Sequence, residues 1–143
     1  MIYHHSEDVS FQPSAKLSIR KWIKGVILNE GKVLGDINYI YCSDEYLLEL
    51  NKKSLNHDYY TDIITFDYVE DNIISGDLFI SIDRVQENAL DHKATFENEL
   101  LRVMIHGVMH LCGYGDKSPD DEKLMRQKEN QYLKDASIWL SNI

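Results

Sequence analysis

The chain has 143 residues, which is enough for one domain with a buried core. Its 24 acidic residues outnumber its 15 basic ones, and the formal net charge of −9 disfavours a protein that binds polyanions over its whole surface. It has only two cysteines, no apolar run near the roughly 18–20 residues of a membrane span and no N-terminal signal-peptide pattern, so we expect a cytoplasmic protein without disulfides or a membrane partner.

The first part of the chain predicts a helix, a strand and a second helix. Pro13 can open the first helix, whose apolar residues recur with the helical period, and Gly31 is its expected end. Residues 33–42 alternate in polarity and are rich in Ile and Tyr, as in a strand. Ser43 can cap the second helix, which we expect to end near Leu55.

The second part of the chain predicts two strands followed by helices. Residues 63–68 and 73–82 have the pattern of a strand hairpin. The pattern over residues 83–112 is helical, with a break expected near Thr95, and its last part is apolar nearly all round. Ser118 can cap a final helix.

This order of elements predicts one α+β domain over residues 1–143. We expect a small mixed β-sheet covered by helices, with no domain boundary, because no repeat or linker-like segment interrupts the chain. The apolar helix near residue 105 should be central and buried, and it carries the most informative motif of the sequence.

That motif is a pair of histidines, His106 and His110. Residues four apart lie on the same face of a helix, so both imidazoles can reach one ion. Gly113 can adopt the left-handed conformation that ends a helix, and Asp116 can then fold back towards the same face. Two imidazoles and one carboxylate leave a coordination position open, which is typical of catalytic sites. We therefore predict one metal ion held by His106, His110 and Asp116.

Each of these residues also has a simpler interpretation. Buried histidines often bond to backbone carbonyls, Asp116 could be a turn residue, and Gly107 could serve only close helix packing. Two bare imidazoles on an apolar helix are costly without partners, which favours the metal site. Cys112 is expected on the wrong face for the ion. The remaining histidines show no ligand spacing and are expected at the surface or in turns: His4, His5, His57 and His92.

The donor set suits Zn²⁺ and also the facial triad of non-haem Fe(II) enzymes. We favour zinc, because no run of strands for a large β-barrel is visible. The spacing is similar to that of the zincins, but Gly107 stands where those peptidases carry their catalytic Glu. The metal would lower the pKa of a bound water and stabilise charge in an attacked ester. We assign no catalytic side chain beyond that water and expect no organic cofactor.

At this point the sequence resembles a known family. The segment His106 to Tyr114 resembles the H-G-x-L-H-L-x-G-Y signature of the YbeY family of metal-dependent endoribonucleases. Other landmarks of the family occur in the right order over roughly residues 50–130: Asn51, the TDIITF segment from Thr61 to Phe66, the GDLFIS segment from Gly76 to Ser81, and Met125 with Glu129.

The resemblance implies a cytoplasmic single-strand-specific endoribonuclease with one zinc ion. It implies roles in maturing the 3′ end of small-subunit ribosomal RNA and in ribosome quality control, with the small ribosomal subunit as a partner. Either a metal-bound water or the RNA's own 2′-hydroxyl could attack. Two positions depart from the family: Asp116 replaces the usual histidine, and Leu55 replaces the usual arginine. Lys53 or His57 could supply the missing cation.

Two other functions compete with this one. In the first, the zinc is structural and the chain is a ribosome-assembly or RNA-binding factor, which the acidic balance and the missing arginine favour. The second is a small zinc peptidase, which Gly107 disfavours. If the protein is a nuclease, a basic stripe on the first helix would bind part of the RNA: Lys16, Arg20 and Lys24. Such stripes are more often plain solvated faces.

Overall fold

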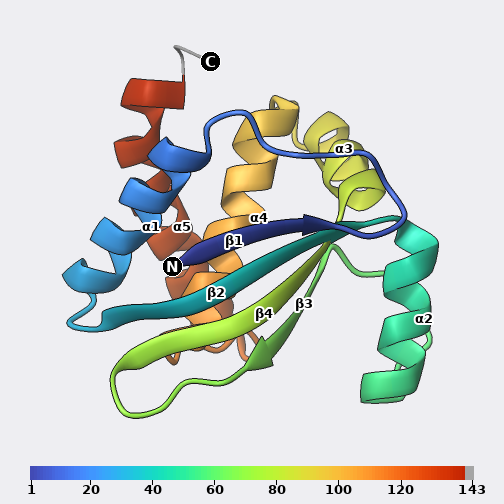
Figure 1. Ribbon diagram of the computed structural model, residues 1–143, viewed down its shortest axis with the longest axis horizontal. Helices are drawn as coiled ribbons and strands as arrows, with labels where there is room; N and C mark the ends of the chain where they lie inside the picture. Colours follow the sequence, from blue (N-terminus) through green and yellow to red (C-terminus); the bar gives the residue numbers. More distant parts are fainter. Residues whose placement is uncertain (141–143) are drawn as a thin grey trace.

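The computed structural model describes the backbone of residues 1–140 and the side chains of residues 1–136. Within this part the elements follow in the order β1 (Ile2–Ser6), α1 (Lys16–Asn29), β2 (Val33–Cys42), α2 (Asp44–Leu55), β3 (Ile63–Asp67), β4 (Ile73–Ser81), α3 (Ile82–Asp91), α4 (Phe96–Leu111) and α5 (Pro119–Leu140). Figure 1 shows one layer of strands with helices packed against it. The predicted α+β class is confirmed, and no helix in the described residues is long and apolar enough to span a membrane.

The sheet has four strands in the order β1-β2-β4-β3. β1 pairs parallel with β2, and β2 pairs parallel with β4, whereas β3 pairs antiparallel with β4. The sheet is therefore mixed, as predicted, and the expected hairpin is β3–β4. The strand β1 was not predicted from the sequence. Its residues Ile2, His4 and Ser6 face the core side, and only the first of them is apolar enough to signal a buried strand.

The two faces of the sheet have different covers. Side chains of β2 and β4 on one face, such as Tyr39 and Leu78, join the main core with α1, α3, α4 and α5. On the other face, Leu47 of α2 packs with Cys42 and Ile64 in a smaller cluster. Figure 1 shows the same division, with α2 apart from the other helices at one end of the sheet. The expected covering of the sheet by helices is confirmed.

Helix α4 is the central helix that the sequence predicts, because ten of its residues are buried. It lies close against β3 and β4 where small residues permit contact. A Cβ at Gly76 would lie 2.7 Å from the carbonyl oxygen of Phe66 and 3.0 Å from Leu111. A Cβ at Gly107 would lie 2.9 Å from Ile63. The packing interpretation of Gly107 therefore has direct geometric support.

The boundaries of the elements follow most of the predicted signals. The helix break near Thr95 is confirmed, since its hydroxyl accepts a hydrogen bond from the Asn98 N–H at the start of α4. Ser118 caps α5 by accepting from the Asp121 N–H at 3.0 Å. The predicted start of α1 at Pro13 was wrong. The helix begins at Lys16, and Pro13 is buried in the segment before it.

Candidate metal centre

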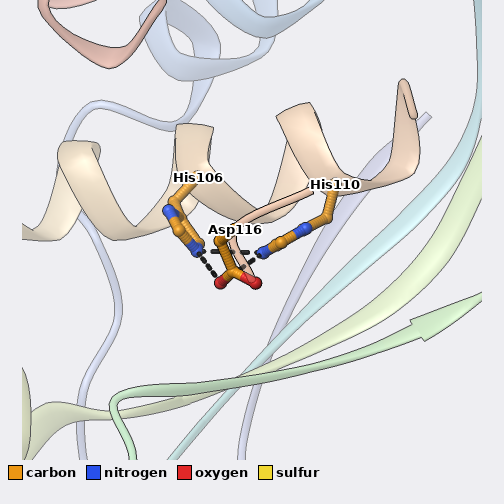
Figure 2. Close-up of side chains that lie close together, drawn as sticks. All are labelled: His106, His110 and Asp116. Atoms are coloured by element: carbon orange, nitrogen blue, oxygen red, sulfur yellow. Dashed lines mark hydrogen bonds and ion pairs between the residues drawn. The ribbon is translucent and has the colours of Figure 1, made fainter. Parts of the chain in front are cut away.

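The two histidines of α4 project from the same face of the helix, one turn apart (Figure 2). Their rings are nearly perpendicular, with centroids 4.6 Å apart and an interplanar angle of 84°. The Nε2 atoms of His106 and His110 lie 3.0 Å from each other. This is the arrangement that helical i, i+4 spacing predicts.

The turn after α4 brings the carboxylate back to the histidines. Gly113 has φ +105, and the Tyr114 N–H donates to the Met109 carbonyl at 3.0 Å, so the helix ends in a left-handed cap. Asp116 Oδ2 then lies 3.2 Å from His110 Nε2 and 3.6 Å from His106 Nε2. One donor atom from each of the three residues falls within 4.8 Å of the others.

The remaining ring nitrogens are held by other groups. His110 Nδ1 donates to the Tyr114 carbonyl at 2.9 Å. His106 Nδ1 donates to Glu129 Oε2 at 2.7 Å. A proton on each Nδ1 leaves the lone pair on each neutral ring at Nε2, the nitrogen that faces Asp116. Backbone and carboxylate partners thus orient both rings in the tautomer that a metal ligand needs.

The distances among the donor atoms fit a tetrahedral ion. Ligand atoms about 2.0–2.1 Å from zinc in a tetrahedral site are about 3.3 Å from one another. The three separations here are 3.0, 3.2 and 3.6 Å. Two imidazole lone pairs and a carboxylate oxygen at such distances repel one another unless a ring proton or a metal cation lies among them. The donor set therefore fits a divalent metal.

Glu129 connects this centre to helix α5. It is only 4% exposed, and it also accepts from Arg102 Nη1 at 3.0 Å. Burial alone would raise the pKa of Glu129, but the hydrogen bonds from His106 and Arg102 hold that pKa below its usual value. Burial opposes the charged form of His106, yet the bond to Glu129 and the charges of Asp62 and Asp116 raise its pKa. Three carboxylates, those of Glu129, Asp62 and Asp116, thus favour positive charge at the His106 ring.

Glu30 holds the turn that carries Asp116. Tyr114 Oη donates to Glu30 Oε1 at 2.5 Å, and Tyr132 Oη and Lys128 Nζ bond to Oε2 of the same carboxylate. Tyr114 is therefore fixed twice, through its side chain on Glu30 and through its carbonyl on His110. The end of α1, the turn after α4 and helix α5 meet at this carboxylate.

Two hollows meet at the candidate metal centre. One has a volume of about 380 Å³ and is lined by residues that include Arg102, Arg126 and Glu129. The other has a volume of about 610 Å³ and is lined by residues of the α2–β3 loop, by Leu55 and by Lys117. His106, Asp116 and Asp62 line both hollows. The open side of the three donors therefore faces space that an extended ligand can occupy.

The other residues singled out in the sequence have different positions. Leu55 and His57 line the larger hollow, whereas Lys53 is not among its lining residues in the described part of the chain. The stripe on α1 is exposed but lines neither hollow there: Lys16, Arg20 and Lys24. Cys112 packs against the core and is not among the three converging donors. His4 is not a surface residue, since it is partly buried against Tyr39 and Tyr41.

The sequence did not reveal Glu129 or Asp62 as partners of the centre. Glu129 did carry a signal, because it lies on an apolar stripe of α5 between buried Met125 and Leu133. An acid on such a stripe needs a buried partner. Asp62 had no such pattern. Burial raises its pKa, while the neighbouring His106 lowers it, and the first effect is larger.

Fold and site together define a small α+β protein with three metal-type donors that converge at the end of a buried helix and remain open on one side. The family described as Endoribonuclease YbeY matches residues 2–137. The chain belongs to this family.

Individual relatives agree with this assignment. The chain is 55% identical over 127 residues to "Endoribonuclease YbeY" of Flavobacterium psychrophilum, covering 89% of this chain and 91% of that protein. It is 50% identical over 132 residues to the protein of the same name from Parabacteroides distasonis, covering 92% and 93%. The solution structure of TM1509 from Thermotoga maritima is similar, with TM-score 0.70 and 31% identity over 99% of this chain and 93% of that one.

Proposed function

We propose that the protein is a metal-dependent endoribonuclease that cleaves single-stranded RNA during ribosomal RNA maturation. The observation that carries this proposal is the meeting of three electron-rich donor atoms at the junction of two hollows. Relatives at about 50% identity are named as endoribonucleases, which supports RNA as the substrate. The proposed acting unit is the single domain formed by residues 1–143 of the chain.

The proposed metal ligands are His106, His110 and Asp116, and the proposed ion is zinc. When bound, zinc would acidify a coordinated water and polarise a phosphate oxygen. Glu129 and the Tyr114 carbonyl fix the tautomer and orientation of the two rings. Asp116 differs from the histidine usual in the family by its negative charge, which makes the centre a weaker electrophile.

Cations beside the donors are candidates for phosphate contact. Lys117 lines the larger hollow, and Arg126 lines the smaller one. Within the part of the chain that the structure describes, Arg126 pairs with no carboxylate, whereas Arg102 is held by Glu129 and Asn130. The charge of Arg126 contributes to lowering the pKa of Glu129, and its guanidinium lines the smaller hollow, where it could also neutralise a phosphate. Lys117 lines the same hollow as Leu55, the position at which the family usually has an arginine.

The proposed cellular setting rests on the family resemblance. We propose that the substrate is the 3′ region of small-subunit ribosomal RNA, that the partner is the small ribosomal subunit, and that the protein acts in the cytoplasm. The basic stripe on α1 stays a prediction as a remote RNA contact.

The competing functions have less support. A peptidase of the zincin type would need an acid in place of Gly107, where even a Cβ would crowd Ile63. A structural zinc would have four protein ligands, whereas the group found among the described residues has three.

The decisive experiment combines metal analysis with RNA cleavage. We expect one ion of zinc per chain in the purified protein, and Asp116→Ala to weaken zinc affinity by roughly 100-fold or more. Cleavage of a ribosomal RNA fragment should fall in parallel and return partly when zinc is added in excess. Asp120→Ala is a suitable control, because Asp120 is an exposed acid at the start of α5. Unchanged zinc content in Asp116→Ala would remove Asp116 from the ligand set.

A further inference from the structure

We propose that Tyr59, backed by His57, is a platform on which an unpaired RNA base stacks beside the metal centre. This inference rests on the proposed function, since it assigns the nucleotide subsite of the same groove. It commits to one ligand chemistry, the flat face of a nucleobase in a single strand.

The first observation is the pair of rings itself. The rings of Tyr59 and His57 stack with centroids 5.1 Å apart and an interplanar angle of 21°. Tyr59 Oη and His57 Nδ1 are 3.0 Å apart, which holds the two side chains together. Tyr59 is nevertheless 55% exposed. The pair therefore presents aromatic surface to solvent in a fixed position.

The second observation is the place of the pair. Tyr59 and His57 line the same hollow as His106, His110 and Asp116. A strand whose phosphate lies at the donors therefore passes the rings with a neighbouring nucleotide. Stacking on an exposed aromatic ring is the usual way in which proteins hold unpaired bases, and it tolerates any base.

The third observation is that the buried residue Asn51 anchors the loop that carries Tyr59 and His57. Asn51 is only 1% exposed, and its Nδ2 donates to the Tyr59 carbonyl at 3.0 Å. The Asn51 carbonyl accepts from the His57 N–H at 3.2 Å, after Asn56 has turned the chain with φ 56. Asn51 at the end of α2 thus holds both ring residues, Tyr59 through its side-chain amide and His57 through its main-chain carbonyl. The bond to His57 belongs to the left-handed end of α2, and the bond from the buried amide fixes Tyr59 relative to that end.

The character of the hollow also favours a base over a second phosphate. Leu55 contributes an apolar surface to it, and Lys117 is its only lysine or arginine among the lining residues described. The net charge of −9 further weakens attraction to phosphates at a distance. Stacking supplies affinity that does not depend on charge, so it suits an acidic protein that handles RNA.

The test is steady-state cleavage of a single-stranded RNA octamer by the zinc-loaded protein. Tyr59→Ala should raise KM by roughly 5- to 100-fold, as expected for loss of one stacked base. It should change kcat by less than about threefold, because the donors and their partners are untouched. Tyr59→Phe keeps the ring and should stay within about twofold of wild type.

Tyr68→Ala provides the matched control. Tyr68 is 56% exposed, it bonds to Asp77, and it does not line the hollow. Octamers with one abasic nucleotide add a second test. Removal of the base at one position of the octamer should raise the KM of wild type by roughly the same factor as Tyr59→Ala does. The same abasic octamer should raise the KM of Tyr59→Ala no further.

The outcomes separate this inference from the proposed function. If wild type cleaves the octamer and Tyr59→Ala matches Tyr68→Ala, the platform is wrong and the nuclease stands. If wild type does not cleave but its binding, measured by fluorescence anisotropy, depends on Tyr59 and on one base, the nuclease is wrong and the platform stands. If it neither cleaves nor binds, both are wrong.

Discussion

At His110 and His106 the two nitrogens of each ring have different partners. Each Nδ1 bonds to an oxygen that can only accept, whereas each Nε2 faces the other histidine and Asp116. The difference matters because a neutral imidazole has one proton and one lone pair. The oxygen that accepts from Nδ1 therefore leaves the lone pair at Nε2, which makes Nε2 the ligand atom. Spacing along the helix places the rings, and these oxygens choose the tautomer.

His4 shows the opposite use of a histidine. Its Nδ1 lies within hydrogen-bond distance of Tyr41 Oη, at 2.8 Å, and burial raises the pKa of Tyr41, so that hydroxyl stays protonated. Burial, together with the charges of Lys16 and His5, lowers the pKa of His4 from 6.5 to about 4. His4 is thus held neutral between β1 and the core.

A stability prediction follows for His4. Its folded-state pKa lies below its unfolded value, so the unfolded state binds more protons between pH 6.5 and about 4. The stabilisation is complete above pH 6.5 and is lost as the pH falls to about 4. The loss should be roughly 1–2 kcal/mol after allowance for partial exposure.

Urea unfolding of wild type and His4→Gln at several pH values checks this prediction. The difference in free energy of unfolding between the two proteins should shrink steadily over that range. A difference that is constant with pH would show that His4 titrates normally.

At the scale of elements, the turn after α4 depends on α1 and α5. Glu30 at the end of α1 receives Tyr114, Tyr132 and Lys128, and its side chain is only 8% exposed. Burial raises the pKa of Glu30, but these three hydrogen bonds more than offset that effect and lower it. The charged carboxylate therefore anchors the segment that leads to Asp116.

We expect Glu30→Gln to loosen this segment. Loss of charge-assisted bonds to a buried carboxylate should cost about 1–3 kcal/mol in the free energy of unfolding. Zinc affinity should fall about tenfold, as for other groups that orient metal ligands from behind. Competition with a zinc-binding dye measures the affinity.

Glu49→Gln is the control for this variant, because Glu49 is 58% exposed and forms an ion pair with Lys52 at 3.4 Å. Its zinc affinity should equal that of wild type. If Glu30→Gln loses stability but binds zinc normally, the carboxylate supports the fold without positioning the metal centre.

At the scale of the whole molecule, the candidate metal centre lies outside the hydrophobic core. The core joins one sheet face to α1, α3, α4 and α5 without using the three donors. A domain of this size has enough buried surface to fold without a metal.

Removal of zinc by a chelator should therefore leave the fold intact and abolish cleavage. The far-ultraviolet circular dichroism spectrum should stay unchanged, and Tm should fall only by the few degrees expected from loss of a bound ligand. Cleavage should return when zinc is restored. Cooperative unfolding on chelation would instead support the structural-zinc alternative.

Much of the fold was predictable because its signals are local. The apolar periodicity of α1 and α4, the alternation of β2 and the caps at Thr95 and Ser118 all lie within a few residues of the feature they determine. β1 was missed because its evidence is not local. It pairs with residues about 35 positions away in β2, and a short edge strand has little pattern of its own.

The candidate site divides in the same way. The sequence by itself determined that His106, His110 and Asp116 meet, because a helical turn and a glycine cap bring together residues within eleven positions. Only the tertiary structure decided what surrounds them. Glu129, Glu30 and Tyr59 reach the site from other elements, and their positions depend on how α5, α1 and α2 pack against the sheet and α4. Local backbone geometry repeats wherever its residues occur, whereas contacts between distant segments exist only once the whole core has packed.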